Sequence, residues 1–131
     1  LLGSGKGNAK AGAAVYESAC CKCHKLFGTG GAVGPELTGY ERGNVLYWLE
    51  NIVDPSAVIR EEYLSFVVRT TNGQTLTGII SGQDKTTVTL RDAEGRETKL
   101  ARKRIEDLRA STTSLMPEGQ LKSLSDQQIR D

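Results

Sequence analysis

The stretch Cys20-Cys21-Lys22-Cys23-His24 has the pattern C-x-x-C-H, with two thiols one helical turn apart and a histidine directly after the second. Thiols at this spacing can each add to a vinyl group on one edge of a porphyrin, and the histidine can then bind the iron through a ring nitrogen. We therefore expect one covalently attached haem c, held by Cys20 and Cys23, with His24 as an iron ligand.

Two other kinds of site use a C-x-x-C pair. A structural zinc site needs four ligands, but this chain has three Cys and one His, all within five residues. Four ligands within so short a stretch cannot surround one zinc ion tetrahedrally. A redox dithiol of the thioredoxin type is expected near a βαβ pattern, which the sequence lacks. Covalent haem is therefore the preferred interpretation.

The length and the charge of the chain predict a single small domain without a strongly charged surface. The chain has 131 residues, a formal net charge of +1 and 5% aromatic residues. The small net charge gives no argument for a nucleic-acid partner or an anionic membrane, and no apolar stretch is long enough to span a bilayer. So few aromatic residues provide little apolar volume for a hydrophobic core. A buried porphyrin would supply apolar volume, unless Leu, Ile and Val suffice.

Three segments of the chain have helical signals. Residues 9–20 are rich in Ala and continue to the first cysteine, so a helix delivers the C-x-x-C-H turn. Asn44 is placed as an N-cap before apolar residues at helical spacing, which Pro55 ends. Residues 125–128 form a capping box that opens a final helix. That helix has barely one turn before Asp131.

The period changes from helix to strand at Tyr63. Apolar and polar residues alternate over 64–69, 76–80, 88–90 and 98–100, and Asn72-Gly73 predicts a two-residue hairpin turn. Residues 105–108 fit a short strand or a helical turn. Several short strands at regular spacing predict a small antiparallel barrel or a strongly bent sheet, similar in pattern to Sm-like barrels.

Two further segments offer groups to a haem iron. Pro35 presents a backbone carbonyl, which commonly accepts a hydrogen bond from the second ring nitrogen of a metal-bound histidine; the alternative is an ordinary turn. Met116, the only methionine, stands before Pro117 in a polar loop, and no second histidine competes with it. A thioether is a soft ligand that raises the reduction potential, so we expect Met116 as the second axial ligand.

Two residues have two interpretations each. Trp48 is a core residue or donates a hydrogen bond from its indole to a haem propionate. Cys21, the odd cysteine, is a reactive or dimer-forming thiol, or a small residue that fills space beside the first helix.

Together these residues resemble a class I c-type cytochrome. That family has a helix with C-x-x-C-H, a Gly-Pro-x-Leu loop, here Gly34 to Leu37, a Met-Pro segment and a C-terminal helix that crosses the first. The resemblance implies that Pro35 and Leu37 contact the haem. It also implies an α+β fold: a mainly helical cytochrome c core at 9–60 and 111–131, with a β insertion at 61–110, in one domain spanning 1–131.

The order of motifs is similar to the haem-binding domain at the C-terminal end of large planctomycete-type proteins, where a Y-x-x-x-x-V-x-T-x-(N/D)-G segment, here Tyr63 to Gly73, leads a β insertion. In such proteins the domain is often fused to dehydrogenase-like or helical-repeat domains. The short final helix departs from the class I pattern, since it should pack on the face of the first helix that holds Gly12 and Tyr16. A swapped dimer is one way to cover that face.

The sequence therefore predicts an electron-transfer module with a redox protein or domain as partner, including one on the same parent chain. The alternative is a gas or redox sensor in which Met116 is displaced. A peroxidase-like enzyme needs a distal acid–base residue, and the chain has no distal histidine. The chain starts at Leu1 without an initiator methionine, which we interpret as a mature fragment or an excised domain. Covalent haem attachment predicts a periplasmic or otherwise extracytoplasmic location.

Overall fold

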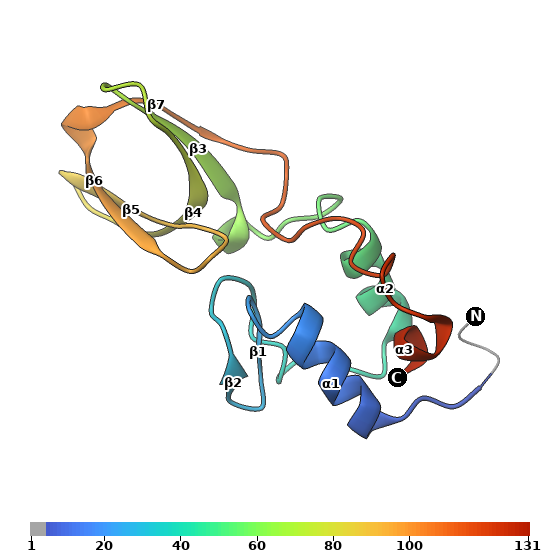
Figure 1. The fold of residues 1–131 in the computed structure, drawn as a ribbon. Coiled ribbons are helices and arrows are strands. Elements are labelled where there is room, and N and C mark those ends of the chain that lie inside the picture. The colour runs from blue at the N-terminus through green and yellow to red at the C-terminus, as the bar shows by residue number, and fades with distance from the viewer. Residues whose placement is uncertain (1–4) are drawn as a thin grey trace. The chain divides into compact units, whose positions relative to one another are not determined.

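The computed structural model describes residues 5–131 and divides into two compact units (Figure 1). Unit 1 comprises Leu1–Asp54 and Pro117–Asp131, and unit 2 comprises Pro55–Met116. Unit 2 is wider than the β insertion expected at 61–110, because residues 55–60 and 111–116 also belong to it. Among the described residues, no helix combines the length and apolar character that crossing a bilayer requires.

The prediction of a mainly helical cytochrome core was wrong. The structure is 24% helical and 28% strand, and it contains a five-stranded antiparallel sheet. Within residues 5–131 the α-helices are α1 (Ala9–Ala19), α2 (Val45–Val53) and α3 (Asp126–Arg130). The segments between and before them are rich in Gly, Pro, Ser and Thr. These residue types favour turns, so the parts of the expected core at 20–44 and 111–125 form loops and a small hairpin, and the strands of the five-stranded sheet lie between these two parts in the sequence.

Side-chain caps fix the starts of the helices where the sequence predicts them. The Asn8 side chain accepts hydrogen bonds from the backbone N–H groups of Lys10 and Ala11 at 3.0 and 3.2 Å. Asn44 caps α2 by accepting from the Tyr47 N–H at 3.2 Å. These caps satisfy backbone donors that have no partner within the first turn. The expected N-cap at Asn44 is therefore confirmed.

The final helix α3 has the predicted capping box at Ser125 and Gln128, and it ends against α1. The carboxylate of Asp131 accepts a hydrogen bond from the Asn8 N–H at 2.9 Å. A Cβ atom at Gly12 would lie 2.2 Å from the Asp131 backbone oxygen. Only glycine permits this approach, so α3 covers the Gly12 position of α1 within a single chain.

The sheet of unit 2 is an antiparallel meander whose last strand returns to its first (Figure 1). Its strand order is β6-β5-β4-β3-β7, with register pairs such as Val67↔Thr77 between β3 and β4 and Val68↔Leu108 between β3 and β7. The strands are β3 (Ser65–Thr70), β4 (Thr75–Gln83), β5 (Thr87–Arg91), β6 (Glu97–Ala101) and β7 (Ile105–Ala110). Short 3-10 turns, η1 (Glu61–Tyr63) and η2 (Arg102–Arg104), precede β3 and β7.

The hairpin between β3 and β4 corrects one detail of the predicted turn. The terminal register pair is Arg69↔Thr75, and the Thr70 N–H donates to the Gln74 carbonyl at 2.9 Å. The loop therefore has three residues, 71–73, and not two. Gly73 has φ +87° at the position where such a loop needs a left-handed residue. Asn-Gly predicts the turn here, but not its length.

Unit 2 has a closed apolar core. Val68 and Val88 are 0% exposed and Leu90 is 3% exposed. Val68 comes from β3, and Val88 and Leu90, two residues apart on β5, point to the same face because side chains alternate along a strand. Five partly buried residues pack against them: Leu76, Ile80, Leu100, Ile105 and Leu108. Burial thus follows the predicted alternation in β5, whereas in β3 Ser65 is buried as well as Val68, although the two were expected on opposite faces.

Candidate haem-binding site

The C-x-x-C-H motif forms a turn directly after α1. The Cys20 N–H donates to the Tyr16 carbonyl at 2.8 Å and closes the last turn of the helix. The N–H groups of Cys23 and His24 then both donate to the Cys20 carbonyl, at 3.1 and 3.0 Å. Both predicted attachment cysteines are half-buried. The backbone thus continues one helical turn past α1, which is the spacing that two thioether bonds to one porphyrin edge require.

His24 is oriented by the loop that contains Pro35. The His24 Nδ1 atom lies 2.8 Å from the Pro35 carbonyl oxygen. A carbonyl oxygen only accepts, so Nδ1 carries the proton and donates. In the neutral ring, Nε2 then keeps its lone pair and is the atom left to bind a metal. The predicted contact between His24 and Pro35 is confirmed.

Glycines of the same loop make room for the imidazole and for the C-x-x-C-H backbone. A Cβ atom at Gly34 would lie 2.5 Å from His24 Cε1 and 2.9 Å from Nδ1. At Gly31 a Cβ would lie 2.0 Å from the Lys22 carbonyl oxygen. A side chain at either position would displace the motif. The glycines therefore serve close packing, a role that their loop-forming tendency alone does not predict.

A small hairpin follows the histidine and is tied to α1 by Tyr16. It consists of β1 (Lys25–Leu26) and β2 (Thr29–Gly30), joined by Phe27 and Gly28 with φ +49° and +83°. The Tyr16 hydroxyl donates a shared hydrogen bond to the carbonyls of His24 at 2.6 Å and Thr29 at 3.0 Å. Sequence reasoning missed this role. The available signal was the position of Tyr16 four residues before Cys20, on the same helix face.

Two groups beside the motif have raised pKa values. Burial raises the pKa of the Cys20 thiol, and the nearby charges of Cys23 and Cys21 add to the rise. Desolvation likewise raises the pKa of the Tyr16 hydroxyl, with Cys21 as the next contributor. The phenol therefore keeps its proton and acts as the donor to the His24 carbonyl. Cys21 lies beside this phenol, at a position between the two attachment cysteines.

Leu37 and Trp48 have local contacts within unit 1. The Leu37 N–H donates to the Lys25 carbonyl at 2.8 Å, which joins the Pro35 loop to β1. The Trp48 indole N–H, which the sequence also allows on a haem propionate, donates to the Glu41 carbonyl at 3.1 Å. The Trp48 ring meets Tyr40 edge-on, with ring centroids 6.1 Å apart. These contacts place Trp48 in an aromatic cluster on α2.

Met116 is the last residue of unit 2, whereas the six other predicted haem-contacting residues belong to unit 1. Its side chain is half-buried, and its N–H donates to the Ser114 hydroxyl at 3.1 Å. The structure thus brings Cys20, Cys23, His24, Pro35 and Leu37 into one unit. Ligation of iron by Met116 stays a prediction.

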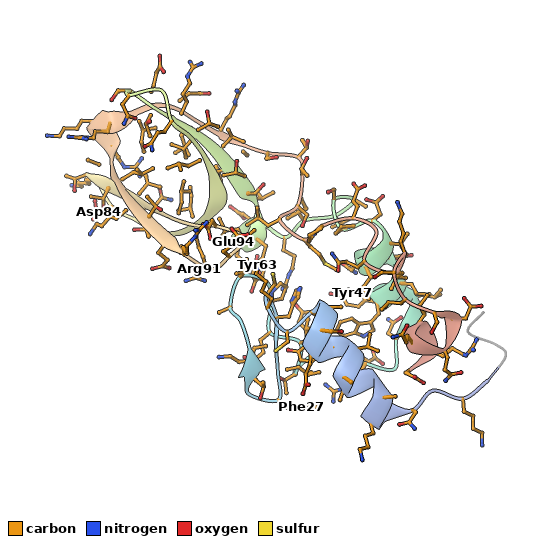
Figure 2. All side chains as sticks on the ribbon, in the orientation of Figure 1. Phe27, Tyr47, Tyr63, Asp84, Arg91 and Glu94 are labelled. Atoms are coloured by element: carbon orange, nitrogen blue, oxygen red, sulfur yellow. The ribbon has the colours of Figure 1, made fainter. Side chains whose placement is uncertain are left out.

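Unit 1 exposes apolar side chains on α2 and in the hairpin that follows His24. Neither α1 nor α2, both described in full, contains a buried residue. Leu46 and Val53 on α2 are 72% and 60% exposed, and Phe27, labelled in Figure 2, is 67% exposed. The donor set at His24, the space left by Gly34 and this uncovered apolar surface all fit a haem. We conclude that the residues present suit the cofactor that the motif predicts.

Comparison with known proteins points to the same cofactor. A family model described as cytochrome C oxidase, cbb3-type, subunit III matches residues 7–75, slightly more than half of the chain. A search of curated proteins found no match. The matched segment includes α1, the C-x-x-C-H motif and α2. Domains of this family contain covalently bound haem c with iron. The chain therefore belongs to the family of cbb3-type cytochrome c oxidase subunit III, a family of c-type cytochromes.

Proposed function

We propose that the chain is a mono-haem electron-transfer domain in which His24 and Met116 are the two axial ligands of the iron. Haem c supplies an iron that gains and loses one electron without chemical change to the protein. The family match supports haem-based electron transfer. His24 is the only histidine and Met116 the only methionine of the chain. In this proposal residues 1–131 act as one cytochrome domain.

The hydrogen bond between His24 Nδ1 and the Pro35 carbonyl, 2.8 Å long, is the observation that carries the proposal. It fixes the tautomer that leaves Nε2 as the ligand atom, and it makes that nitrogen more basic. Gly34 leaves the ring free of a steric clash. Cys20 and Cys23 hold the porphyrin edge covalently, so the cofactor stays with the protein in both oxidation states.

Met116 sets the oxidation state that is favoured. A neutral thioether stabilises ferrous iron relative to ferric iron and so raises the reduction potential. With His24 and Met116 both bound to it, a haem iron would have no position left for a substrate. For this reason we propose an electron carrier and not an enzyme.

The test is an absorption spectrum of the purified haem protein, oxidised and then reduced, for the wild type and Met116→Ala. We expect sharp low-spin bands on reduction and a weak sulfur-to-iron charge-transfer band in the oxidised wild type. Met116→Ala should lose that band and have a lower potential. Glu118→Ala, an exposed residue of the same loop, serves as the control. An unchanged spectrum and potential in Met116→Ala would rule out the methionine ligand.

A gas or redox sensor is the second candidate. One observation favours it: the two proposed ligands belong to different compact units, His24 to unit 1 and Met116 to unit 2. In this function a gas would displace the thioether of Met116 from the iron. Rapid binding of carbon monoxide to the reduced protein would support this function. Absence of binding over minutes would count against it.

The partner that we propose is a redox protein or domain, such as a dehydrogenase, on the same parent chain or on a separate one. The proposed location is periplasmic or otherwise extracytoplasmic, since c-type cytochrome domains are typically found there. Reduction by a candidate donor in stopped-flow mixing, with oxidised wild-type protein, would identify the partner.

A further inference from the structure

The segment from β7 to Met116 is held by unit 2 at three points. The Ser111 N–H donates to the Ser65 carbonyl at 2.8 Å and extends the pairing of β7 with β3. The Ser65 hydroxyl donates to the Thr113 carbonyl at 2.7 Å. The Ser114 N–H then donates to the Ser56 hydroxyl at 3.1 Å. The chain is therefore bound to the β unit until two residues before Met116.

Ser65 is the buried member of this set. It is the first residue of β3 and is 1% exposed, one of two buried polar residues in the described chain. Its hydrogen bond joins residues 48 positions apart. A buried hydroxyl cannot exchange its partner for water, so this contact holds more firmly than an exposed one. No buried side-chain N or O atom in residues 5–131 lacks a hydrogen-bond partner.

Few rotations remain between this anchor and the Met116 side chain. The Ser114 hydroxyl accepts from the Met116 N–H at 3.1 Å, so the anchored residue also contacts the methionine backbone. Pro117 follows Met116 and restricts its backbone to extended conformations. The position of the Met116 backbone is therefore set largely by residues of unit 2.

We propose that unit 2 positions the Met116 ligand, with Ser65 as the main positioning residue and Ser56 as the second. This inference rests on the proposed ligation of iron by Met116. It gives the β unit a role in the cytochrome: its sheet holds the loop in the arrangement from which the thioether binds. A change at the start of β3 then alters the strength of an iron bond, while haem attachment at Cys20 and Cys23 is unaffected.

Ser65→Ala in the intact, haem-loaded protein tests this proposal, with the sulfur-to-iron charge-transfer band and the reduction potential as readouts. We expect a weaker band, a lower potential and a methionine that carbon monoxide displaces about fivefold faster, the factor that one neutral hydrogen bond supplies. Ser56→Ala removes the acceptor of the Ser114 N–H from a less buried site, and it should have the same effect in smaller measure. This variant tests the proposal even if Ser65→Ala does not fold.

Thr70→Ala is the matched control. Thr70 is the other buried polar residue, 4% exposed, and lies at the opposite end of β3. Its hydroxyl bonds with the Asn72 side chain and accepts from the Gln74 N–H, so it closes the hairpin and does not touch the Met116 loop. Thr70→Ala should lower the stability of the sheet and leave the band and the potential unchanged.

The outcomes separate this inference from the proposed function. A wild-type protein without the charge-transfer band would show that Met116 is not a ligand. The proposed function and the positioning role would then both be wrong. Suppose that the wild type has the band and that the band is equally strong in Ser65→Ala, Ser56→Ala and Thr70→Ala. This result would overturn the positioning role alone. A loss of band in Ser65→Ala and Ser56→Ala, with Thr70→Ala unaffected, supports it.

Discussion

The two units of this chain differ in how they bury apolar side chains. Unit 2 encloses Val68, Val88 and Leu90 on one face of its sheet, with at most 3% exposure. Unit 1 buries only Val33 among its described large apolar residues, and its helices α1 and α2 contain no buried residue. The β unit thus forms a core from protein alone, and the helical unit does not.

The difference teaches what each unit needs in order to be stable. Burial of apolar side chains is the main favourable term in folding. In unit 2 the sheet provides it. In unit 1 the His24 Nδ1 atom has a hydrogen-bond partner, while apolar side chains of α2 are exposed. A covalently bound haem would supply the missing apolar volume, which is why we expect unit 1 to depend on its cofactor and unit 2 to be independent of it.

The largest expected effect concerns the core of unit 2. Val68→Ala removes two buried carbon atoms and leaves a cavity, so it should lower the free energy of unfolding of unit 2 by about 2–3 kcal/mol. Val58→Ala, at an 80% exposed position of the same unit, is the control and should change it little. Denaturant unfolding followed by circular dichroism measures both. Haem content should be unchanged; a loss of haem in Val68→Ala would break the proposed independence of the units.

The next effect concerns the histidine of unit 1. Gly34→Ala places a Cβ atom 2.5 Å from His24 Cε1, so the ring or the loop must move. We expect about 1–3 kcal/mol of lost stability in the haem protein, and a shifted potential because the Pro35 hydrogen bond is distorted. Gly39→Ala, where a Cβ meets nothing within 4 Å, is the control. Equal potentials for the two variants would argue against a tightly fitted imidazole.

A smaller effect should follow from Tyr16→Phe. This variant removes the hydroxyl that bonds the His24 and Thr29 carbonyls and keeps the ring. We expect a loss of about 1 kcal/mol, measured as a lower thermal midpoint of the haem protein. Tyr47→Phe on α2, whose ring stacks on Tyr40, is the control. If both variants unfold at the wild-type temperature, the phenol does not tie α1 to the hairpin.

The smallest effect is a pH dependence confined to unit 2. The carboxylate of Asp84 (labelled in Figure 2) accepts hydrogen bonds from the backbone N–H groups of Thr86 and Thr87 and also from their hydroxyl groups. These hydrogen bonds hold the pKa of Asp84 well below its usual range. A carboxylate whose pKa is lowered by folding stabilises the fold above its unfolded pKa, and this stabilisation is lost as the pH falls toward the folded pKa. Unit 2 should therefore weaken as the pH drops below about 4.

The measurement is the unfolding midpoint of unit 2 against pH for the wild type and Asp84→Asn. The variant keeps a carbonyl oxygen as acceptor but does not titrate in this range. Its midpoint should therefore depend less on pH than that of the wild type. Parallel curves for the two proteins would show that Asp84 does not contribute to acid sensitivity.

Local features of the fold were predictable from the sequence because neighbouring residues determine them. The N-cap at Asn44, the capping box at Ser125 and the alternation in β5 depend on residue types a few positions apart. The contact of His24 with Pro35 was also predictable, since a C-x-x-C-H motif followed by Gly-Pro favours it.

Features that depend on distant residues were not predictable in this way. The mainly helical fold was wrong because the resemblance to class I cytochromes implied helices where Gly, Pro, Ser and Thr form loops. The bond from Ser65 to Thr113 joins residues 48 positions apart, and no pattern within either segment marks it. The close approaches at Gly31 and Gly34 likewise depend on how the loop folds back onto the motif.

Amide hydrogen exchange with and without haem tests the central claim most directly. The haem-loaded protein would be compared with Cys20→Ser/Cys23→Ser, which cannot attach the cofactor. We predict that haem slows the exchange of amides in α1 and α2 far more than the exchange of amides in the unit 2 strands. Equal protection of α1 and α2 in the two proteins would contradict the account, because unit 1 would then be stable without the haem that is proposed to complete its core.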